Sequence, residues 1–430
     1  MLDKLFIQLE KFTPARYRWI WSHEGFRRYF TNTGWMFFGQ VFALVLSFFI
    51  GAWLARYLGP TNYGIINYAV AFSGLFGFVA SLGVDVILIR ELVKTPERRD
   101  ELMGTCFVLK LIGGVIALAL AAAAAFIFEA SPLNRLFIII FSLSFITQSF
   151  NVIVYYFQAG VKAKHNAISQ IVANLITAIF KIIFILSGAD LIWIIIIFAA
   201  DSVWQTILFV YYYQHQGLRL GAWRFDKSLA GKILSGSWLL MLSAAASFIF
   251  MKIDQVMIGR MIGEGAVGLY AVAVKFGEIW YFLPGIICSS LFPAIVNARQ
   301  VSAELYKQRL RNFYILMLSV SIFIALGTTI LSRPAVLILF GQEYLSSVAL
   351  LRIYVWSGVG LFLGWAVQQR LMVENRLKTV FVAYLIIMLL NIGLNIIFIN
   401  RFGLTGAAWA TLISYSLLPL LMMGKGKERK

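Results

Sequence analysis

Nine ionisable side chains lie inside apolar runs that are long enough to cross a membrane. An ionisable group at mid-bilayer costs about 2.5–3.5 kcal/mol on insertion scales, so each needs a partner, a wet cavity or a route to the interface. Cations at such depth can neutralise an anionic ligand, and carboxylates there can bind a proton or a cation. The nine are Lys110, Lys181, Lys252, Lys275, Arg352, Asp85, Asp201, Asp254 and Glu278.

Lys275 is the strongest of these candidates. It lies near the middle of its apolar run, too deep for its side chain to reach the interface. The simpler alternative pairs it with Glu278, three residues on and on the same helical face. Such a pair still needs polar surroundings, because burying two ions is rarely stabilising. We predict that Lys275, Lys252 and Lys181 make a cavity electropositive, and we add Arg90 to this substrate-binding set.

The other charges have both structural and functional interpretations. Asp201 is followed one turn later by Gln205 and is a candidate proton or cation site. Asp254 lies about 200° around the helix from Lys252, so the two face opposite ways; Arg260 is its structural alternative. Asp85 and Glu278 complete the set of possible ion-coupling groups or structural partners.

Charges near the ends of the runs have simpler explanations. Asp85 and Arg90 lie where an interfacial ion pair suffices, and the long stem of Lys110 can reach the interface. Arg352 lies near an outer end. Pro284 and Gly285 interrupt the run that holds Lys275, and we expect them to break the helix there, either as a hinge or as a static kink.

Composition places the chain in a membrane. Of 430 residues, 61% are hydrophobic and 13% are charged, in runs of the roughly 20 residues that a transmembrane helix needs. Two cysteines in apolar runs and three scattered histidines predict no disulfide, no metal site and no cofactor beyond a possible H⁺ or Na⁺. The net charge of +18 is explained by the positive-inside rule, so we expect no nucleic-acid partner.

Twelve membrane spans emerge from hydropathy, which makes the fold all-α. Both termini and the even-numbered loops hold most of the 37 Lys and Arg residues, so we place these termini in the cytoplasm. The odd-numbered loops hold few. The predicted spans are 34–55, 65–88, 102–127, 136–157, 167–186, 191–213, 238–258, 266–292, 314–331, 348–368, 380–399 and 407–423.

The domain boundaries follow from the spans. An interfacial, non-cleaved segment (1–30) precedes a six-helix lobe (31–213) and a basic cytoplasmic linker (214–236). A second six-helix lobe (237–423) and a basic tail (424–430) follow.

An ungapped repeat relates the two lobes. LARYLGPTNYGIINYAVAF (54–72) returns as IGRMIGEGAVGLYAVAVKF (258–276), with Arg56 on Arg260, Gly59 on Gly263 and Gly64 on Gly268. An even number of spans in each half makes the halves parallel, and related halves are typical of transporters with a site between them. Ala71 corresponds to Lys275, so the lysine is not needed to build the helix pair.

The repeated stretch and its surroundings resemble the oligosaccharide flippases of polysaccharide biosynthesis, which are related to multidrug and toxin extrusion transporters. The matching residues are Leu54–Pro60, Tyr63–Gly64, Leu82–Asp85, Arg90–Glu91, Asp254–Gly259, Gly268–Lys275 and Gly403–Ala408. The resemblance implies two six-helix lobes around a central cavity. It also implies outward passage of a polyprenyl-diphosphate-linked oligosaccharide through the cytoplasmic membrane.

Lysine suits such cargo, because a compact point charge can hold a diphosphate transiently. We therefore expect a flippase rather than an enzyme, with membrane lipids and other polysaccharide-assembly membrane proteins as further partners. The alternative within transport is H⁺- or Na⁺-coupled efflux of cationic drugs, which calls for carboxylates and aromatic groups in the cavity. A membrane glycan polymerase or ligase fits poorly, because the outer loops are short and lack histidine. A scaffolding role leaves the deep charges unexplained.

Overall fold

The computed structural model describes residues 24–374 and 376–423, and regular structure in this part of the chain is entirely helical. Ten helical segments are long and apolar enough to cross a membrane. Two of these, in α3 and α18, are pairs of spans joined at Gly59 and Gly403, where the backbone leaves helical geometry. The described chain therefore makes twelve passes, which confirms the predicted fold class.

The first lobe contains the first six passes. Its elements are α3 (Glu24–Gly74), α4 (Gly77–Ser81), α5 (Val84–Lys94), η2 (Pro96–Arg98), α6 (Arg99–Phe128), α7 (Pro132–Ser142), α8 (Ser144–Thr147), η3 (Gln148–Asn151), α9 (Val152–Ala159), α10 (Ala163–Leu186) and α11 (Leu191–His215).

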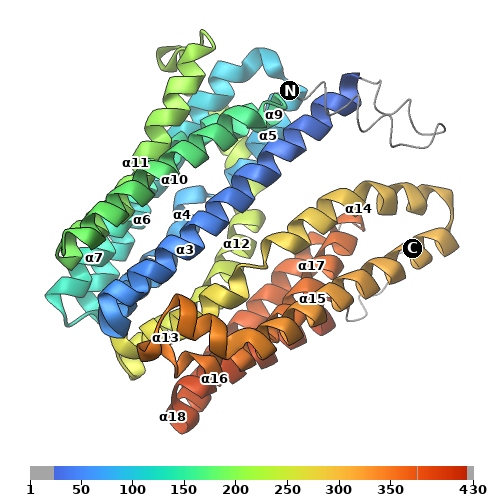
Figure 1. Cartoon of the computed structure of the whole chain (residues 1–430). Helices are drawn as coiled ribbons and strands as arrows, with labels where there is room; N and C mark the ends of the chain where they lie inside the picture. The colour runs from blue at the N-terminus through green and yellow to red at the C-terminus, as the bar shows by residue number, and fades with distance from the viewer. Residues whose placement is uncertain (1–23, 375, 424–430) are drawn as a thin grey trace, which may run out of the picture.

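The second lobe follows η4 (Leu220–Ala222) and contains the other six passes. Its elements are α12 (Lys227–Met261), α13 (Glu264–Glu278), α14 (Phe282–Val301), α15 (Ala303–Leu339), η5 (Gln342–Tyr344), α16 (Ser347–Tyr354), α17 (Ser357–Val373) and α18 (Leu377–Met423). Figure 1 shows the lobes as two groups of helices that meet where α13 packs against α3.

Large apolar side chains cover the outside of both lobes. Ile127 is 74% exposed in the first lobe, and Phe323 is 80% exposed in the second. Exposed apolar surface on this scale needs a lipid environment, because soluble monomers rarely present it to water. The protein is therefore a multi-pass membrane protein.

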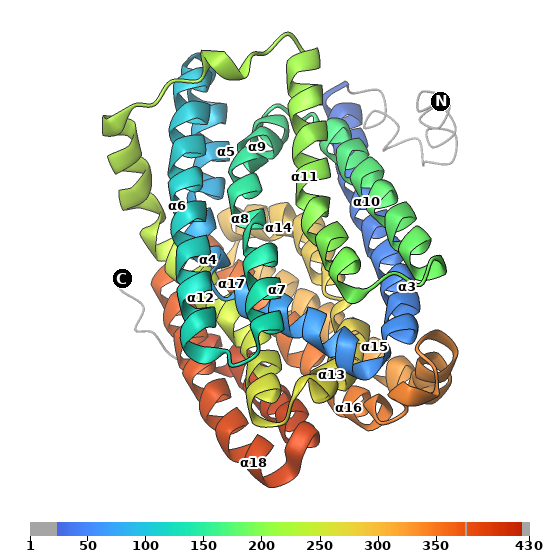
Figure 2. The same ribbon diagram turned by 90° about the vertical axis from the view of Figure 1, so that its left-hand side faces the viewer.

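The linker packs against the first lobe before α12 begins. The backbone N–H of Arg224 donates to the carbonyl of Asp100, and that of Asp226 donates to Thr105 Oγ1; Figure 2 shows this crossing above α6. Asp226 then caps α12 by accepting from the backbone N–H of Leu229, and this bond lowers the pKa of its carboxyl. The helix thus begins at residue 227, inside the segment (214–236) that we predicted as linker.

The repeat sets the shape of both lobes. Gly59 and Gly263, which the repeat aligns, both adopt positive φ (70° and 126°) and turn the chain between the first two spans of their lobes. A residue with a Cβ is strained in that region, so glycine is required at both turns. The predicted correspondence is therefore also a correspondence in backbone geometry.

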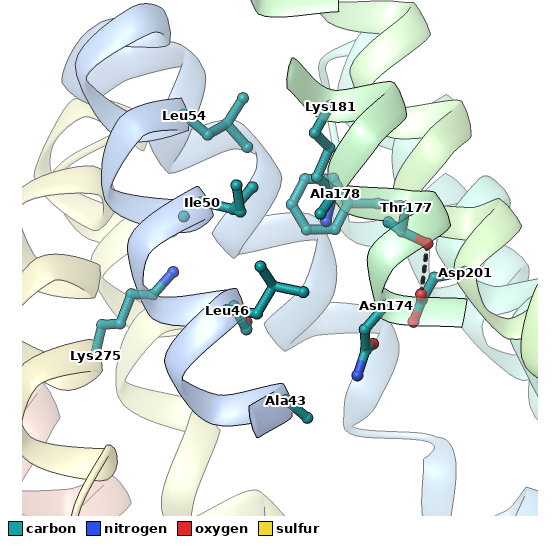
Figure 3. A pocket seen from close by; sticks show the side chains of 13 residues that line it. Ala43, Leu46, Ile50, Leu54, Asn174, Thr177, Ala178, Lys181, Asp201 and Lys275 are labelled. Atoms are coloured by element: carbon teal, nitrogen blue, oxygen red, sulfur yellow. Dashed lines mark hydrogen bonds between the residues drawn. The ribbon is translucent and has the colours of Figure 1, made fainter. Parts of the chain in front are cut away.

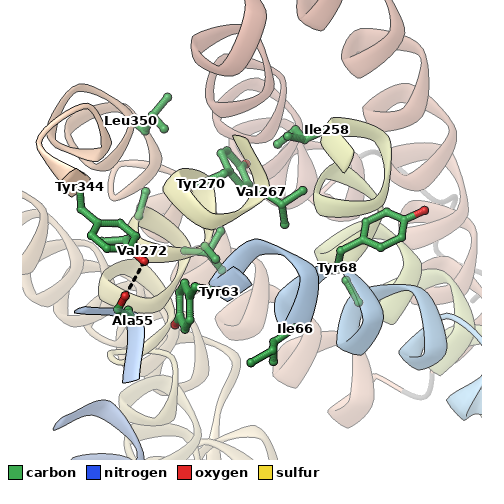
Figure 4. Close-up of a cluster of buried hydrophobic side chains, with 14 of the residues drawn as sticks. Ala55, Tyr63, Ile66, Tyr68, Ile258, Val267, Tyr270, Val272, Tyr344 and Leu350 are labelled. Atoms are coloured by element: carbon green, nitrogen blue, oxygen red, sulfur yellow. Dashed lines mark hydrogen bonds between the residues drawn. The ribbon is translucent and has the colours of Figure 1, made fainter. Parts of the chain in front are cut away.

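The two copies of the repeat pack against each other across the lobe interface. A Cβ on Gly64 would lie 1.8 Å from the carbonyl oxygen of Glu264, and one on Gly268 would lie 1.9 Å from that of Pro60. The repeat aligns Gly64 with Gly268 and Pro60 with Glu264, so the contact is the same when the copies are exchanged. Tyr63, Ile66, Val267 and other buried side chains surround it (Figure 4).

Reciprocal arginine contacts lie beside this crossing. The Arg56 guanidinium donates to the carbonyl of Ile338 at the end of α15, at 3.1 Å. Its repeat equivalent, Arg260, donates to the carbonyl of Phe128 at the end of α6. Each arginine thus joins its own lobe to the carboxyl end of the third span of the other lobe, where the helix dipole is negative. These contacts hold the lobes together on the side of the odd-numbered loops.

Several spans are broken within the membrane. The second span is divided at residues 75–76 and 82–83, and the fourth is divided into α7, α8, η3 and α9. The eighth breaks between α13 and α14, and Pro284 lies in the first turn of α14. The ring of a proline clashes with the carbonyl group four residues earlier, so a regular helix cannot continue through this position. The expected break is therefore confirmed, and its use as a hinge stays a prediction. Most of the predicted interfacial segment and all of the tail lie outside the described residues.

Candidate functional site

A cavity of about 190 Å³ lies between α3, α10 and α11 of the first lobe and α13 of the second. Lys275 and Lys181 both line it, so two cations share the same cavity. In Figure 3 the Lys275 side chain points toward α3 from the side opposite the labelled side chains of α10 and α11. The structure thus brings together two of the four predicted substrate-binding residues, and their role in binding stays a prediction.

The Lys275 ammonium group reaches the cavity across a glycine. A Cβ on Gly51 would lie 1.6 Å from Lys275 Nζ, so only glycine at this position leaves room for the ammonium group. Within the described part of the chain, the Lys275 ammonium group forms no hydrogen bond and no ion pair. A partly buried cation without a protein anion is costly, and an anionic ligand would remove that cost.

Lys181 has different surroundings. Its ammonium group stands over the ring of Phe198, 3.5 Å from the centroid, in a cation–π contact. Asp201 lies in the same cavity, where its oxygens accept from Thr177 Oγ1 at 2.7 Å and from Gln205 Nε2 at 2.9 Å. The predicted proximity of Asp201 and Gln205 is confirmed. The cavity holds two cations and one carboxylate.

Lys252 does not line this cavity. Its ammonium group contacts both oxygens of Glu278 at 2.9 Å, across from α12 to α13. The alternative that pairs Glu278 with Lys275 is therefore wrong. The α12 helix lies alongside the end of α13, and Lys252 from α12 forms the ion pair with Glu278 instead. Because Glu278 compensates its charge, Lys252 adds less positive charge to the cavity than we expected from the sequence.

Asp254 is enclosed in the second lobe. One oxygen accepts from Tyr270 OH at 2.7 Å and from Thr411 Oγ1 at 3.4 Å, and the other accepts from the backbone N–H of Gln255 at 2.7 Å. Its expected structural partner, Arg260, contacts the first lobe instead, at Phe128 and Glu129. Asp254 thus ties α12 to α13 and α18.

The charges of the second and third spans are paired differently from the expected arrangement. Lys110 is 2% exposed and contacts Asp85 at 2.6 Å, so it does not extend to the interface. Arg90 is exposed and pairs with Glu91, not with Asp85, and it lines none of the cavities described here. Helical phase explains the change, because Asp85 faces α6 while Arg90 points away from it. Arg352 donates to Ser332 Oγ at 3.0 Å.

Replacing Asp85 with alanine is expected to destabilise the protein by about 3–5 kcal/mol, because it leaves Lys110 buried and uncompensated. Replacing Glu91 with alanine removes an exposed pair, which is worth about 0–1 kcal/mol, and serves as the matched control. Thermal unfolding in detergent measures both. Equal melting temperatures for the two variants would show that the Lys110–Asp85 pair contributes no more than a surface contact.

Sequence reasoning missed several lining residues. Thr177 precedes Lys181 by one helical turn, so it was recognisable as a neighbour on the same face. Asn174 lies one turn earlier again. Gly51 gave no signal, because its role depends on where α13 lies beside α3. Phe198 was one of many aromatic residues in an apolar run.

Solved structures with the same arrangement of helices define the class of fold. The chain superposes with a TM-score of 0.74 on an inward-facing multidrug resistance transporter of the MATE family, MOP superfamily (14% identity, 88% of this chain and 92% of the other). The lipid II flippase MurJ in an inward closed conformation gives 0.72 (18% identity, 90% and 86%). An outward-facing MATE-family transporter of the MOP superfamily gives 0.61 (15% identity, 92% and 93%).

The sequence pattern of one family covers most of the chain. The chain belongs to the polysaccharide biosynthesis protein family, whose pattern matches residues 30–299. This confirms the family resemblance read from the repeat and its surroundings. No curated protein matches the sequence.

Proposed function

We propose that the protein is a flippase that moves a polyprenyl-diphosphate-linked oligosaccharide across the cytoplasmic membrane by alternating access. The observation that carries the proposal is the Lys275 ammonium group, which lies in a cavity between the lobes without a protein anion among the described residues. Family membership and the fold support a membrane transporter in polysaccharide biosynthesis. The diphosphate supplies the missing negative charge.

The lobe interface supplies a way to release the cargo. Lys275 belongs to the second lobe, whereas α3, α10 and α11 belong to the first. If the lobes part on the side of the odd-numbered loops, α13 leaves α3 and withdraws the cation from the cavity. The diphosphate then loses one of its two contacts as the path opens. Lysine suits this cycle because its contact with phosphate is a single point charge.

The closed side of the molecule is proposed to be the outer side. The even-numbered loops and the linker carry the positive charge that is typical of the cytoplasmic side. The reciprocal Arg56 and Arg260 contacts then close the outer end, so this conformation admits cargo from the cytoplasm. The TM-score with the inward-facing MATE-family transporter (0.74) is higher than that with the outward-facing one (0.61), which supports this assignment.

The experiment that tests the function reconstitutes the full chain in vesicles with a fluorescent polyprenyl-diphosphate-linked oligosaccharide. A membrane-impermeant quencher reaches only the labelled lipid in the outer leaflet. The protein-dependent change in the quenched fraction of the label measures flipping. We expect flipping well above that of empty vesicles and no uptake of a cationic dye. Dye transport without lipid flipping would identify a drug exporter instead, the alternative that Asp201 and Phe198 in the cavity favour.

A proton or sodium gradient is proposed to drive the cycle through Asp201, because this carboxylate shares the cavity with both lysines. Asp201→Asn keeps a similar shape, removes the charge and is expected to abolish acceleration by the gradient. Asp254→Asn is the comparison variant, since Asp254 is enclosed by Tyr270, Thr411 and its own helix. Flipping rates with and without each gradient test this. Retained acceleration in Asp201→Asn, with loss in Asp254→Asn, would move the coupling site to the second lobe.

A further inference from the structure

A second cavity, of about 360 Å³, lies between the lobes and differs in chemistry from the first. It is lined by the end of α3, α4, the α7–α8 junction and α12, and none of its lining residues is ionisable. Four phenylalanines form much of its wall: Phe78, Phe141, Phe145 and Phe248. Its polar groups are uncharged: Ser73, Ser81, Ser144 and Gln148.

These polar groups keep hydrogen-bonding capacity. The Ser73 hydroxyl donates to the carbonyl of Ala69 at 2.7 Å, so its oxygen remains free to accept. The Ser81 hydroxyl donates to the carbonyl of Phe78 at 3.2 Å, and its oxygen accepts from the backbone N–H of Gly83 at 3.5 Å. Within the described residues, the Ser144 hydroxyl and the side-chain amide of Gln148 form no hydrogen bond. The cavity therefore offers both donors and acceptors to a ligand.

Two of the three membrane spans beside this cavity, the second and the fourth, are broken. Leu82 and Gly83 adopt positive φ (51° and 64°) next to α4, and the fourth span changes from α7 through α8 to η3 at the same cavity. Irregular backbone at membrane depth is tolerated where it lines a polar cavity, and discontinuous helices mark binding sites in transporters. Leu82 is notable because a residue with a Cβ is strained there.

The two cavities are neighbours across a pair of packed rings. Phe198, which stands under Lys181 in the cationic cavity, packs against Phe141 of the second cavity with centroids 6.2 Å apart. A ligand that contacts Lys181 with its phosphate and passes this ring pair places its next chemical group beside Phe141. In a lipid-linked oligosaccharide the group next to the diphosphate is a sugar ring.

We propose that the second cavity binds the first sugar ring of the cargo while the cationic cavity holds the diphosphate. The carbon–hydrogen faces of a pyranose pack against phenylalanine rings, and its hydroxyls pair with Ser144 and Gln148. The cavity lies within the roughly 300–1,000 Å³ typical of small-ligand sites. A polyprenyl tail is the less suitable occupant, because it would leave the serines and the amide unpaired. This inference rests on the proposed function.

Two soluble probes test the assignment on the full-length protein in detergent: a short fluorescent prenyl diphosphate, and the same compound with one hexose on the diphosphate. The hexose is expected to tighten binding about tenfold. Gly77→Leu fills the cavity beside Phe145, and Gln148→Ala removes an amide. Both variants are expected to abolish the hexose increment and keep the affinity for prenyl diphosphate. Phe323→Ala, on the lipid-facing surface, is the matched control and is expected to keep both affinities.

Each outcome has a distinct meaning. A hexose increment that survives in Gly77→Leu and Gln148→Ala, with wild-type melting temperatures, would overturn the sugar site. Equal weakening of both probes, growing with prenyl length, would also overturn it and assign the cavity to the tail. If the wild-type protein binds neither probe, the proposed function fails rather than the sugar site. Lys275→Ala is expected to weaken both probes by the same factor, which separates the two cavities.

Discussion

Lys275→Glu is expected to slow flipping of the lipid-linked oligosaccharide by at least about a hundredfold at equal expression. A hydrogen bond to a charged group contributes about 1.5–3 kcal/mol, and a hundredfold change corresponds to about 2.7 kcal/mol. The substitution removes that contact and adds repulsion between a carboxylate and the diphosphate. Lys275→Ala removes only the contact, so its expected loss is smaller, about tenfold or more. Initial rates in reconstituted vesicles measure both.

Gly51 provides an independent check on the same cation. Gly51→Ala places a methyl group where Lys275 Nζ now lies, and it is expected to displace the ammonium group from the cavity. The variant should therefore reproduce the loss seen with Lys275→Ala, and the double variant should lose little more than either single one. Gly393→Ala, where a Cβ meets no neighbour, is the matched control. Wild-type flipping by Lys275→Ala and Lys275→Glu would exclude Lys275 from cargo binding.

Gly64→Ala and Gly268→Ala are expected to part the lobes on the side of the odd-numbered loops. Each new Cβ would lie within 2 Å of a backbone carbonyl oxygen of the other lobe, which neither helix can avoid by rotating a side chain. Overpacking of this kind costs about 1–3 kcal/mol, enough to shift a two-state equilibrium about 5–150-fold. The pseudo-symmetric contact predicts similar shifts for both variants. Flipping should fall as the closed conformation becomes rare.

Spin labels on Leu133 and Phe402 report the separation of the lobes in a background without Cys106 and Cys288. Both labelled side chains are exposed, at 44% and 58%. We expect the distance distribution to move to longer values in Gly64→Ala and Gly268→Ala, and to stay as in wild type in the control Gly327→Ala. Unchanged distances together with wild-type flipping would show that the glycine crossing is not the contact that opens.

The ion pairs inside the membrane could be predicted from the sequence only in part. The depth of Lys275 was predictable from its place in the apolar run, but the absence of an ion pair between Lys275 and Glu278 was not. Residues three apart on one helix are always neighbours, whereas Lys252 could reach Glu278 only because α12 lies alongside that end of α13. For the same reason Lys110 of α6 forms an ion pair with Asp85 of α5 and does not extend to the water at the interface. Local spacing limits which pairs form within a helix and leaves pairs between helices open.

The sequence by itself determined the twelve spans, the two related lobes, the glycine turns and the charges that the membrane must accommodate. Hydropathy and backbone conformation decide these features, and both are local: a bilayer requires apolar helices, and positive φ requires glycine. Only the tertiary structure decided that the Lys275 ammonium group passes Gly51 into the cavity between the lobes, which Lys181 and Asp201 of the first lobe also line. Helix rotation and crossing depend on packing summed over many side chains. The site arises from that sum, because its members come from four helices.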